Sequence, residues 1–157
     1  MKIDPPLPPG GGAGSLADRQ ARLVAALTCG APVPSGFDPR LIDVARVALL
    51  RKRAGEVAGQ WPRLAAAYGP RWPREFARWA ATRPTRGPLR DGWDLARELG
   101  ATLPAQAGGE LAAREAAMRY DGASAPRPRR LPAVRRAAGT TVVQIAGRVW
   151  LIGRGIG

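Results

Sequence analysis

Proline and glycine interrupt this chain so often that only short helices and strands fit between them. The 157 residues include 16 Pro and 20 Gly. Proline is tolerated in the first turn of a helix but breaks its interior, and glycine commonly ends a helix. The sequence has neither the strand–helix alternation of a parallel sheet nor a glycine-rich nucleotide fingerprint. We therefore expect a mainly α protein with a small β part: five to six short helices followed by a C-terminal β-hairpin.

The first two helices have the clearest starting signals. Ser15 forms an approximate capping box with Asp18 and begins the first helix. Asp38 is a suitable N-cap for the second helix, and Pro39 then occupies the first helical position. The second helix is predicted to continue to Gln60. One stripe along it, at helical spacing, consists of Leu41, Val44, Ala45, Ala48, Leu49 and Lys52.

Four further helices are predicted at about residues 62–68, 72–81, 89–99 and 109–119, each bounded by Gly or Pro. Tryptophan is frequent in this region. Large rings fill volume in a small bundle built mainly from alanine, so most of the five Trp are expected in the core. Trp150, which lies outside the helices, is instead the best candidate for a protein interface, where Trp is enriched.

The C-terminal segment changes character. Residues 140–146 are apolar and rich in β-branched side chains, Ala146 and Gly147 can form a tight turn, and 148–152 provide a return strand. A lone hairpin is marginally stable in water, so this one should pack on the helices or on a partner. The resulting organisation is a Pro/Gly-rich disordered tail at 1–14, a helical domain at 15–120, an Arg/Pro-rich linker at 121–139 and the hairpin at 140–154.

The residue inventory restricts the chemistry that the chain can perform. It contains no His and a single Cys, Cys29. Ser-His-Asp and Cys-His pairs, His-ligated metals and Cys-rich metal sites are therefore excluded. Asp91 and Asp94 could be a pair of catalytic acids, but both lie in the first turn of a predicted helix, where acids are expected. The sequence thus favours a binding protein over an enzyme and predicts no cofactor in this chain.

The charge is strongly positive and uneven. The chain carries a formal net charge of +13, and residues 122–157 contain seven Arg and no acid. Such a charge attracts nucleic acids, acidic peptides or acidic protein surfaces. No apolar run is long enough to span a bilayer, and a single Cys gives no reason to invoke an oxidising compartment, so we expect a cytoplasmic protein without membrane contact.

Candidate binding residues lie in the linker and the hairpin. Arginine binds phosphates or carboxylates, and an exposed strand edge can accept an added strand from a peptide. Two alternatives stay open: the arginines could belong to a solvated linker, and the hairpin edge could pack against the helices. The candidates for contact with a peptide or partner are Arg129, Arg130, Arg135, Arg136, Val143, Ile145, Arg148 and Trp150.

Four segments resemble a known bacterial domain: LADRQARLVAAL, GFDPRLIDVARVALLRKRAGEVAGQWPRLAAAYG, WAATRPTRGPLRDGWDLARELG and VVQIAGRVWLIGR. They are similar to the partner domain that is fused behind, or encoded beside, multinuclear non-haem iron-dependent oxidases that modify ribosomally synthesised peptides. The resemblance extends over about residues 15–154.

The resemblance implies an accessory subunit that forms a heterodimer with the oxidase and helps to bind the leader of the precursor peptide in natural-product biosynthesis. It assigns no catalytic residue to this chain. Iron in such an oxidase needs His and carboxylate ligands, so it is expected in the partner. The alternative function is a small basic nucleic-acid-binding protein, although no recognition-helix, zinc-finger or RNA-binding aromatic motif is present.

Overall fold

The computed structural model describes residues 15–145 and 148–154, and the side chains among them except at 145, 153 and 154. It confirms a mainly helical chain with a small antiparallel C-terminal part. The predicted tail at 1–14 and the turn at Ala146 and Gly147 lie outside the described residues. The helices are α1 (Leu16–Cys29), α2 (Pro39–Gln60), α3 (Pro62–Tyr68), α4 (Trp72–Ala80), α5 (Pro88–Leu99) and α6 (Ala105–Ala117), with short 3₁₀ turns at Gly69–Arg71 and Gly100–Thr102.

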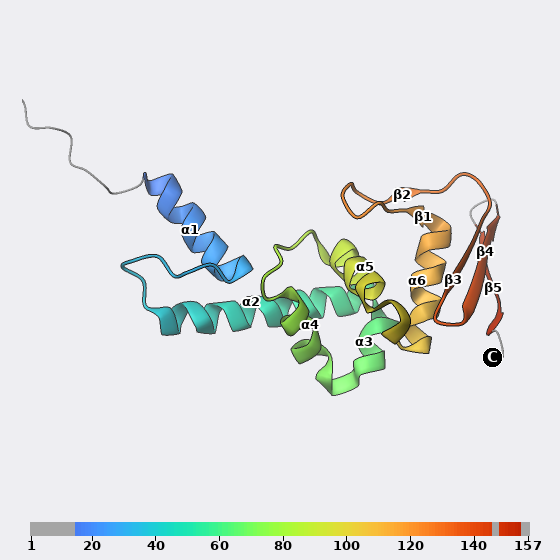
Figure 1. Cartoon of the computed structure of the whole chain (residues 1–157), viewed down its shortest axis with the longest axis horizontal. Coiled ribbons are helices and arrows are strands. Elements are labelled where there is room, and N and C mark those ends of the chain that lie inside the picture. The colour runs from blue at the N-terminus through green and yellow to red at the C-terminus, as the bar shows by residue number, and fades with distance from the viewer. Residues whose placement is uncertain (1–14, 146–147, 155–157) are drawn as a thin grey trace, which may run out of the picture.

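The elements are spread along one long axis. Figure 1 shows α1 and the first half of α2 at one end and the C-terminal strands at the other, with α6 beside the strands. The second half of α2 packs with α3, α4 and α5 into the helical body. None of the described helices is long and apolar enough to cross a membrane.

The predicted starts of α1 and α2 are confirmed atom by atom. The Ser15 Oγ accepts a hydrogen bond from the Asp18 N–H at 3.2 Å, and the Ser15 N–H donates to the Asp18 carboxylate at 2.9 Å. This is the reciprocal capping box expected from the sequence. The Asp38 carboxylate accepts from the Arg40 N–H at 2.8 Å, with Pro39 in the first turn of α2. Local capping therefore fixes both entry points.

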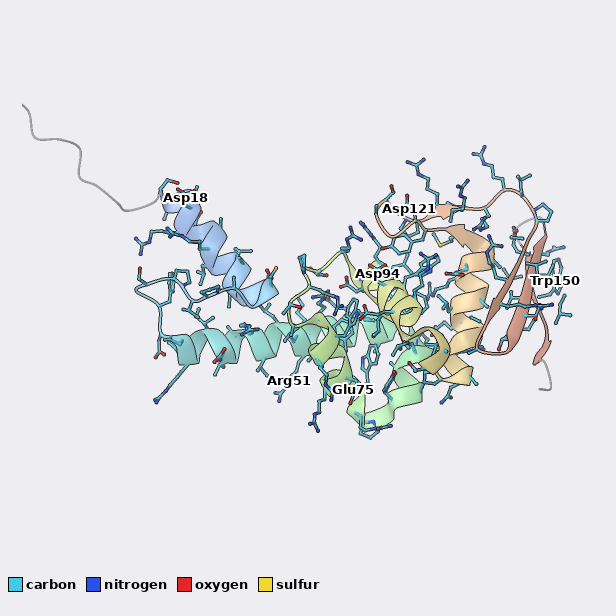
Figure 2. The ribbon with its side chains drawn as sticks, in the orientation of Figure 1. Asp18, Arg51, Glu75, Asp94, Asp121 and Trp150 are labelled. Carbon is cyan, nitrogen blue, oxygen red and sulfur yellow. The ribbon has the colours of Figure 1, made fainter. Side chains whose placement is uncertain are left out.

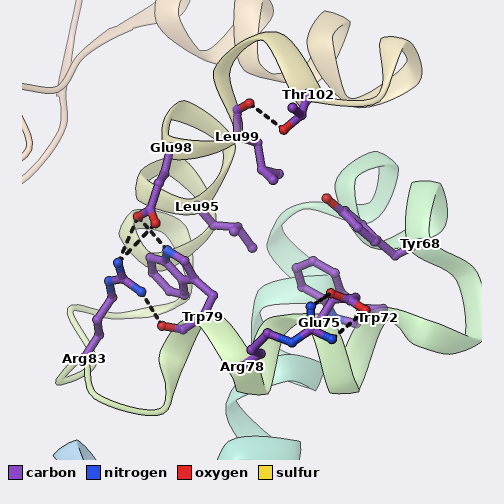
Figure 3. Close-up of a pocket in the computed structure, with 10 residues that line it drawn as sticks. All are labelled: Tyr68, Trp72, Glu75, Arg78, Trp79, Arg83, Leu95, Glu98, Leu99 and Thr102. Carbon is purple, nitrogen blue, oxygen red and sulfur yellow. Dashed lines mark hydrogen bonds and ion pairs between the residues drawn. The ribbon is translucent and has the colours of Figure 1, made fainter.

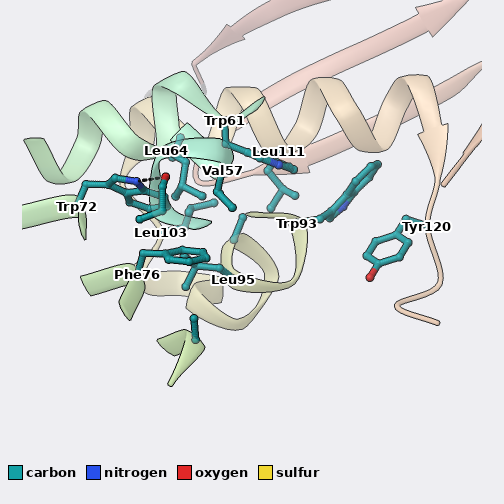
Figure 4. Close-up of a cluster of buried hydrophobic side chains, with 14 residues drawn as sticks. Val57, Trp61, Leu64, Trp72, Phe76, Trp93, Leu95, Leu103, Leu111 and Tyr120 are labelled. Carbon is teal, nitrogen blue, oxygen red and sulfur yellow. Dashed lines mark hydrogen bonds between the residues drawn. The ribbon is translucent and has the colours of Figure 1, made fainter. Parts of the chain in front are cut away.

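Aromatic side chains build the helical core (Figure 4). Trp61 and Trp93 are fully buried and meet edge to face with their ring centroids 5.9 Å apart. The buried indoles find acceptors for their N–H groups: Trp61 donates to the Leu89 carbonyl and Trp72 to the Ala54 carbonyl, both at 2.9 Å. Four of the five Trp contribute to this core or pack against it, as predicted, and Trp150 does not.

A buried ion pair ties α2 to α5. The Arg53 Nε donates to the Asp91 carboxylate at 2.8 Å, and the Asp91 side chain is almost completely buried. The same carboxylate accepts from the Thr85 hydroxyl at 2.8 Å and the Arg86 N–H at 2.9 Å. The Asp91 carboxylate therefore makes three contacts within the chain that stabilise the fold. Asp94 accepts from the Tyr120 hydroxyl at 3.0 Å, so both acids serve the fold. Asp91 lies in the first turn of α5 as predicted, whereas Asp94 lies in the second turn, because the helix begins at Pro88.

The C-terminal strands form more than the predicted hairpin. They are β1 (Met118–Arg119), β2 (Arg127–Pro128), β3 (Ala133–Ala137), β4 (Thr140–Ile145) and β5 (Arg148–Arg154). β1 pairs with β2, and β3, β4 and β5 form an antiparallel three-stranded sheet in that order. The predicted hairpin corresponds to β4 and β5. The segment 121–139, predicted to be a linker, contains β2 and β3.

Two backbone features explain the additional strand. Ala138 and Gly139 both have positive φ values, 44° and 76°, as a two-residue hairpin turn requires, so β3 turns tightly into β4. Along β3, Ala133 is buried and Val134 is exposed, which fits a strand with one covered face. The sequence predicts a linker here because the region is rich in Arg and Pro, so the alternation of β3 was not recognised. α6 likewise begins at Ala105, four residues before the predicted Gly109.

Glycine allows α6 to approach the sheet closely. A Cβ on Gly108 would overlap the Cβ of Ala138 and lie 2.8 Å from the Ala137 carbonyl oxygen. Further along the same helix, Ala112 and Ala116 are fully buried against Val142 of β4. Small side chains on α6 therefore set the distance between helix and sheet.

Replacing Asp91 by Ala should lower the free energy of unfolding by about 3–5 kcal/mol, because it leaves the Arg53 guanidinium buried without its counter-ion. Urea denaturation followed by circular dichroism measures this change. Asp43→Ala is the matched control, since Asp43 makes an exposed ion pair with Arg46 at 3.5 Å. The control should change the free energy by less than about 0.5 kcal/mol. Equal losses in the two variants would contradict the structural role of Asp91.

Candidate functional site

The C-terminal sheet has one covered face and one open face. Opposite residues of an antiparallel pair point to the same side. Val142, which packs on α6, pairs with Arg135 and Leu151, so these three define the α6 face. Val143 pairs with Val134 and Trp150, on the opposite side of the sheet. We call this second side the open face; by register its described side chains are Val134, Arg136, Thr141, Val143, Arg148 and Trp150. The pairing of β4 with β5 is irregular between Thr140 and Val142, and Ile152 of β5 lies next to this irregularity.

Large apolar side chains of the open face are exposed. The exposed fractions are 54% for Val134 and 47% for Trp150, and the neighbouring Ile152 of β5 is 62% exposed. Figure 2 shows Trp150 on the sheet, at the opposite end of the chain from Asp18 of α1. An exposed apolar patch that spans three strands is a typical sign of a binding surface.

Among the strands that the structure describes, β5 is an edge of the sheet with no partner on its outer side. Strand β4 pairs with it on one side, and α6 packs less extensively on β5 than on β3 and β4. Val149 and Leu151 on the α6 side of β5 are also exposed, at 39% and 58%. An edge strand presents unpaired N–H and C=O groups that can accept another strand. β5 thus offers backbone hydrogen bonds together with apolar side chains on both faces.

A pocket with charged side chains lies beside Leu151 of β5. A pocket of about 300 Å³ is lined by α3, α6 and Leu151, and includes Arg63, Glu110 and Arg114. The Glu110 carboxylate accepts from the Leu64 N–H at 2.9 Å and so caps α3. The Arg114 guanidinium lies 4.4 Å from the centroid of the Trp61 ring, and burial lowers the pKa of Arg114 against the opposing effect of Glu110. β5 and the helices α3 and α6 therefore meet in a partly buried pocket that contains two arginines and one glutamate; we call it the recess.

The structure brings together four of the predicted site residues: Arg136, Val143, Arg148 and Trp150 share the open face. Ile145 pairs through its backbone with Arg148, but its side chain lies outside the described residues.

Three predicted arginines lie elsewhere. The Arg129 Nε donates to the carbonyls of Glu115 and Met118, at 2.9 and 3.0 Å, and so holds the end of α6. Partial burial, followed by the nearby Arg135 and Arg119 guanidiniums, lowers the pKa of Arg129. Arg135 projects to the α6 side by register, and Arg130 is exposed before β3. Arg129 is therefore a structural residue.

Sequence reasoning missed several members of the site. Val134 lies in the predicted linker, and Leu151 and Ile152 were assigned to the return strand without a binding role. A signal was present in the uninterrupted apolar run from Val149 to Ile152. A half-buried strand alternates polar and apolar side chains, whereas a run of this kind needs apolar contacts on both faces. Arg63 and Arg114 could not be found, because only the packing of α3 against α6 brings them to the sheet.

A second concave region lies in the helical body (Figure 3). It has a volume of about 360 Å³, and its walls include Tyr68, Trp72 and Trp79. Its charges are satisfied within the chain: the Glu98 carboxylate accepts from the Trp79 Nε1 at 2.9 Å and from Arg83 at 3.1 Å, and Arg78 pairs with Glu75 at 3.1 Å. Among the residues that the structure describes, no group of three or more Cys, Asp or Glu is placed to hold a metal ion.

Comparison with known proteins places the helical body in a family. Residues 17–101, from α1 to the end of α5, match the family model described as SCO6045-like, C-terminal domain. A UPF0276 protein of Streptomyces avermitilis is 40% identical over 85 residues, which are 54% of this chain and 18% of that relative. The matching part thus spans about a fifth of the relative's length. No solved structure matches the chain. Since the family model covers more than half of the residues, the chain belongs to the SCO6045-like, C-terminal domain family.

Proposed function

We propose that this protein is a non-catalytic partner of a multinuclear non-haem iron-dependent oxidase and that it binds the leader of a ribosomally made precursor peptide. The observation that carries the proposal is the open edge strand β5 beside an exposed apolar face. The leader adds to β5 as a further antiparallel or parallel strand. The oxidase then receives a peptide that is held at one end.

Backbone pairing supplies the affinity in this arrangement. Strand addition satisfies the unpaired groups of an edge, and side chains alternate between the two faces of the enlarged sheet. On one side they meet Trp150, and on the other they meet Leu151, with the exposed Ile152 next along β5. A leader with apolar residues at alternate positions therefore fits β5.

Arginine favours an acidic leader. Arg136 and Arg148 lie on the open face and are exposed, and Arg63 and Arg114 line the recess next to Leu151. Guanidinium groups bind carboxylates through two parallel hydrogen bonds. The same charge increases the rate of encounter with an acidic peptide.

The family relationship supports a partner role. The Streptomyces avermitilis protein matches this chain over only 18% of its own length, so most of that protein is additional polypeptide. We propose that the present chain performs in trans what the matching part performs within such a longer protein. Iron ligands come from the oxidase, because this chain contains no His.

Removing the exposed apolar groups of β5 should weaken binding of the precursor peptide. We expect Trp150→Ala/Ile152→Ala to raise the Kd at least about 10-fold, as for a small interface hot spot. Fluorescence anisotropy with a labelled precursor peptide, encoded beside the oxidase, measures the Kd. Both side chains are largely exposed, so the thermal unfolding midpoint should change little.

Leu16→Ala is the matched control for this double variant. Leu16 is 71% exposed on α1, far from the sheet, and its replacement should leave the Kd of the peptide unchanged. Equal peptide affinity in wild type and Trp150→Ala/Ile152→Ala would contradict the site. Tighter binding to duplex DNA or RNA than to the peptide, falling steeply with salt, would instead support the nucleic-acid alternative.

Strand addition also predicts a period of two in the peptide backbone. Successive N–H groups of a strand point alternately toward and away from its neighbour. N-methylation of successive leader residues, one at a time, should therefore weaken binding strongly at every second position and little in between. Competition anisotropy measures the series. A period of three to four would indicate a helical leader, and loss at every position or at none would also contradict pairing with β5.

A further inference from the structure

The end of the chain remote from the sheet carries a second exposed apolar surface. Figure 1 shows the first half of α2 extending beyond the helical body, with α1 along one side. The exposed fractions of Leu41, Val44 and Val47 are 67%, 68% and 48%. These side chains have no role in the core, which in this part of α2 uses Ile42 instead.

The exposed groups lie on one side of α2. With 3.6 residues per turn, Leu41, Val44 and Ala48 fall within a narrow stripe, and Val47 flanks it. They belong largely to the stripe that the sequence shows at helical spacing. We call Leu41, Val44, Val47 and Ala48 the α2 apolar face. A helix of a stable protein that is apolar on more than one side is normally covered on each of them.

Basic side chains border the α2 apolar face. Arg40 and Arg51 fall on the same side of the helix by the same spacing, and both are exposed. Figure 2 shows Arg51 projecting from α2 away from α1. A second copy of this chain would bring these arginines and a net charge of +13 against each other, which disfavours self-association. Arg40 and Arg51 instead favour a different partner protein, whose docking surface is apolar and surrounded by acidic residues.

The family match indicates which protein covers this surface. The matched residues 17–101 contain both α1 and α2, whereas the C-terminal sheet lies outside the match. In the Streptomyces avermitilis relative, over four-fifths of the polypeptide lies outside the stretch that matches this chain. In that relative, the segment that corresponds to α1–α5 is linked to a much longer polypeptide, which can cover the α2 apolar face.

We propose that the α2 apolar face is the docking surface for the oxidase, and that this oxidase corresponds to the additional polypeptide of the UPF0276 relative. This inference rests on the proposed function and adds the position of the contact. The contact places the oxidase at one end of the chain and the leader-binding edge at the other. The exposed stretch of α2 from residue 39 to 51 is about 18 Å long, which suits the central part of a standard interface.

Charge introduced into the α2 apolar face tests the proposal. We expect Leu41→Asp/Val44→Asp to weaken binding to the UPF0276 protein of the same genome at least 100-fold, measured by isothermal titration calorimetry. Binding of the precursor peptide should stay within 2-fold of wild type. Leu16→Asp/Leu131→Asp is the control, since it makes the same charge change at two exposed apolar side chains outside both α2 and the open face and should retain oxidase binding. Leu41→Ala/Val44→Ala, expected to weaken binding at least 5-fold, replaces the charged pair if that variant does not fold.

The outcomes separate this inference from the proposed function. If the wild-type chain does not bind the UPF0276 protein, both are wrong. If it binds and the α2 variants bind equally well, only the position of the docking surface is wrong. A wild-type chain that dimerises, with a monomeric Leu41→Asp/Val44→Asp variant, would overturn the inference by showing a contact between copies.

Discussion

The structure depends on α6 packing closely on two sides at once. Ala107 and Leu111 enter the aromatic core of the helical body, while Ala112 and Ala116 meet Val142 of the sheet. Gly108 brings the helix close to the β3–β4 turn, where a larger side chain would overlap Ala138. One face of a three-stranded sheet is thereby covered by a single helix. Within residues 15–145 and 148–154, no further strand pairs with β5 and α6 is the helix that packs on the sheet, so the other face and this edge form the candidate site.

The helical half of the fold was predictable because local chemistry determines it. Ser15, Asp38 and Pro39 mark helix starts through interactions within a few residues, and the structure confirms each one. The exposure of the apolar stripe on α2 was not predictable, since spacing shows which residues share a side but not what covers them. The sheet was harder still. β3 has an arginine-rich sequence, and only pairing with β4 and packing on α6 make it a strand.

The candidate site was predictable in part for the same reason. Trp150, Val143 and Arg148 belong to a hairpin that the sequence identifies, and the register places them on one face. Arg129 has the same side chain as Arg148 but a different role, because its guanidinium holds two carbonyls at the end of α6. Net charge alone cannot distinguish these two arginines. The absence of His was the more informative count, since it excludes His-ligated metal sites from this chain whatever the arrangement of the arginines.

The central claim is that a peptide pairs with β5. Amide hydrogen exchange of the full chain, with and without saturating precursor peptide, tests it most directly, because a new inter-strand hydrogen bond slows exchange of the amide that makes it. The account predicts slower exchange in residues 148–154 and no change in α2. Protection confined to the helical body, or the absence of protection in β5 at saturation, would contradict it.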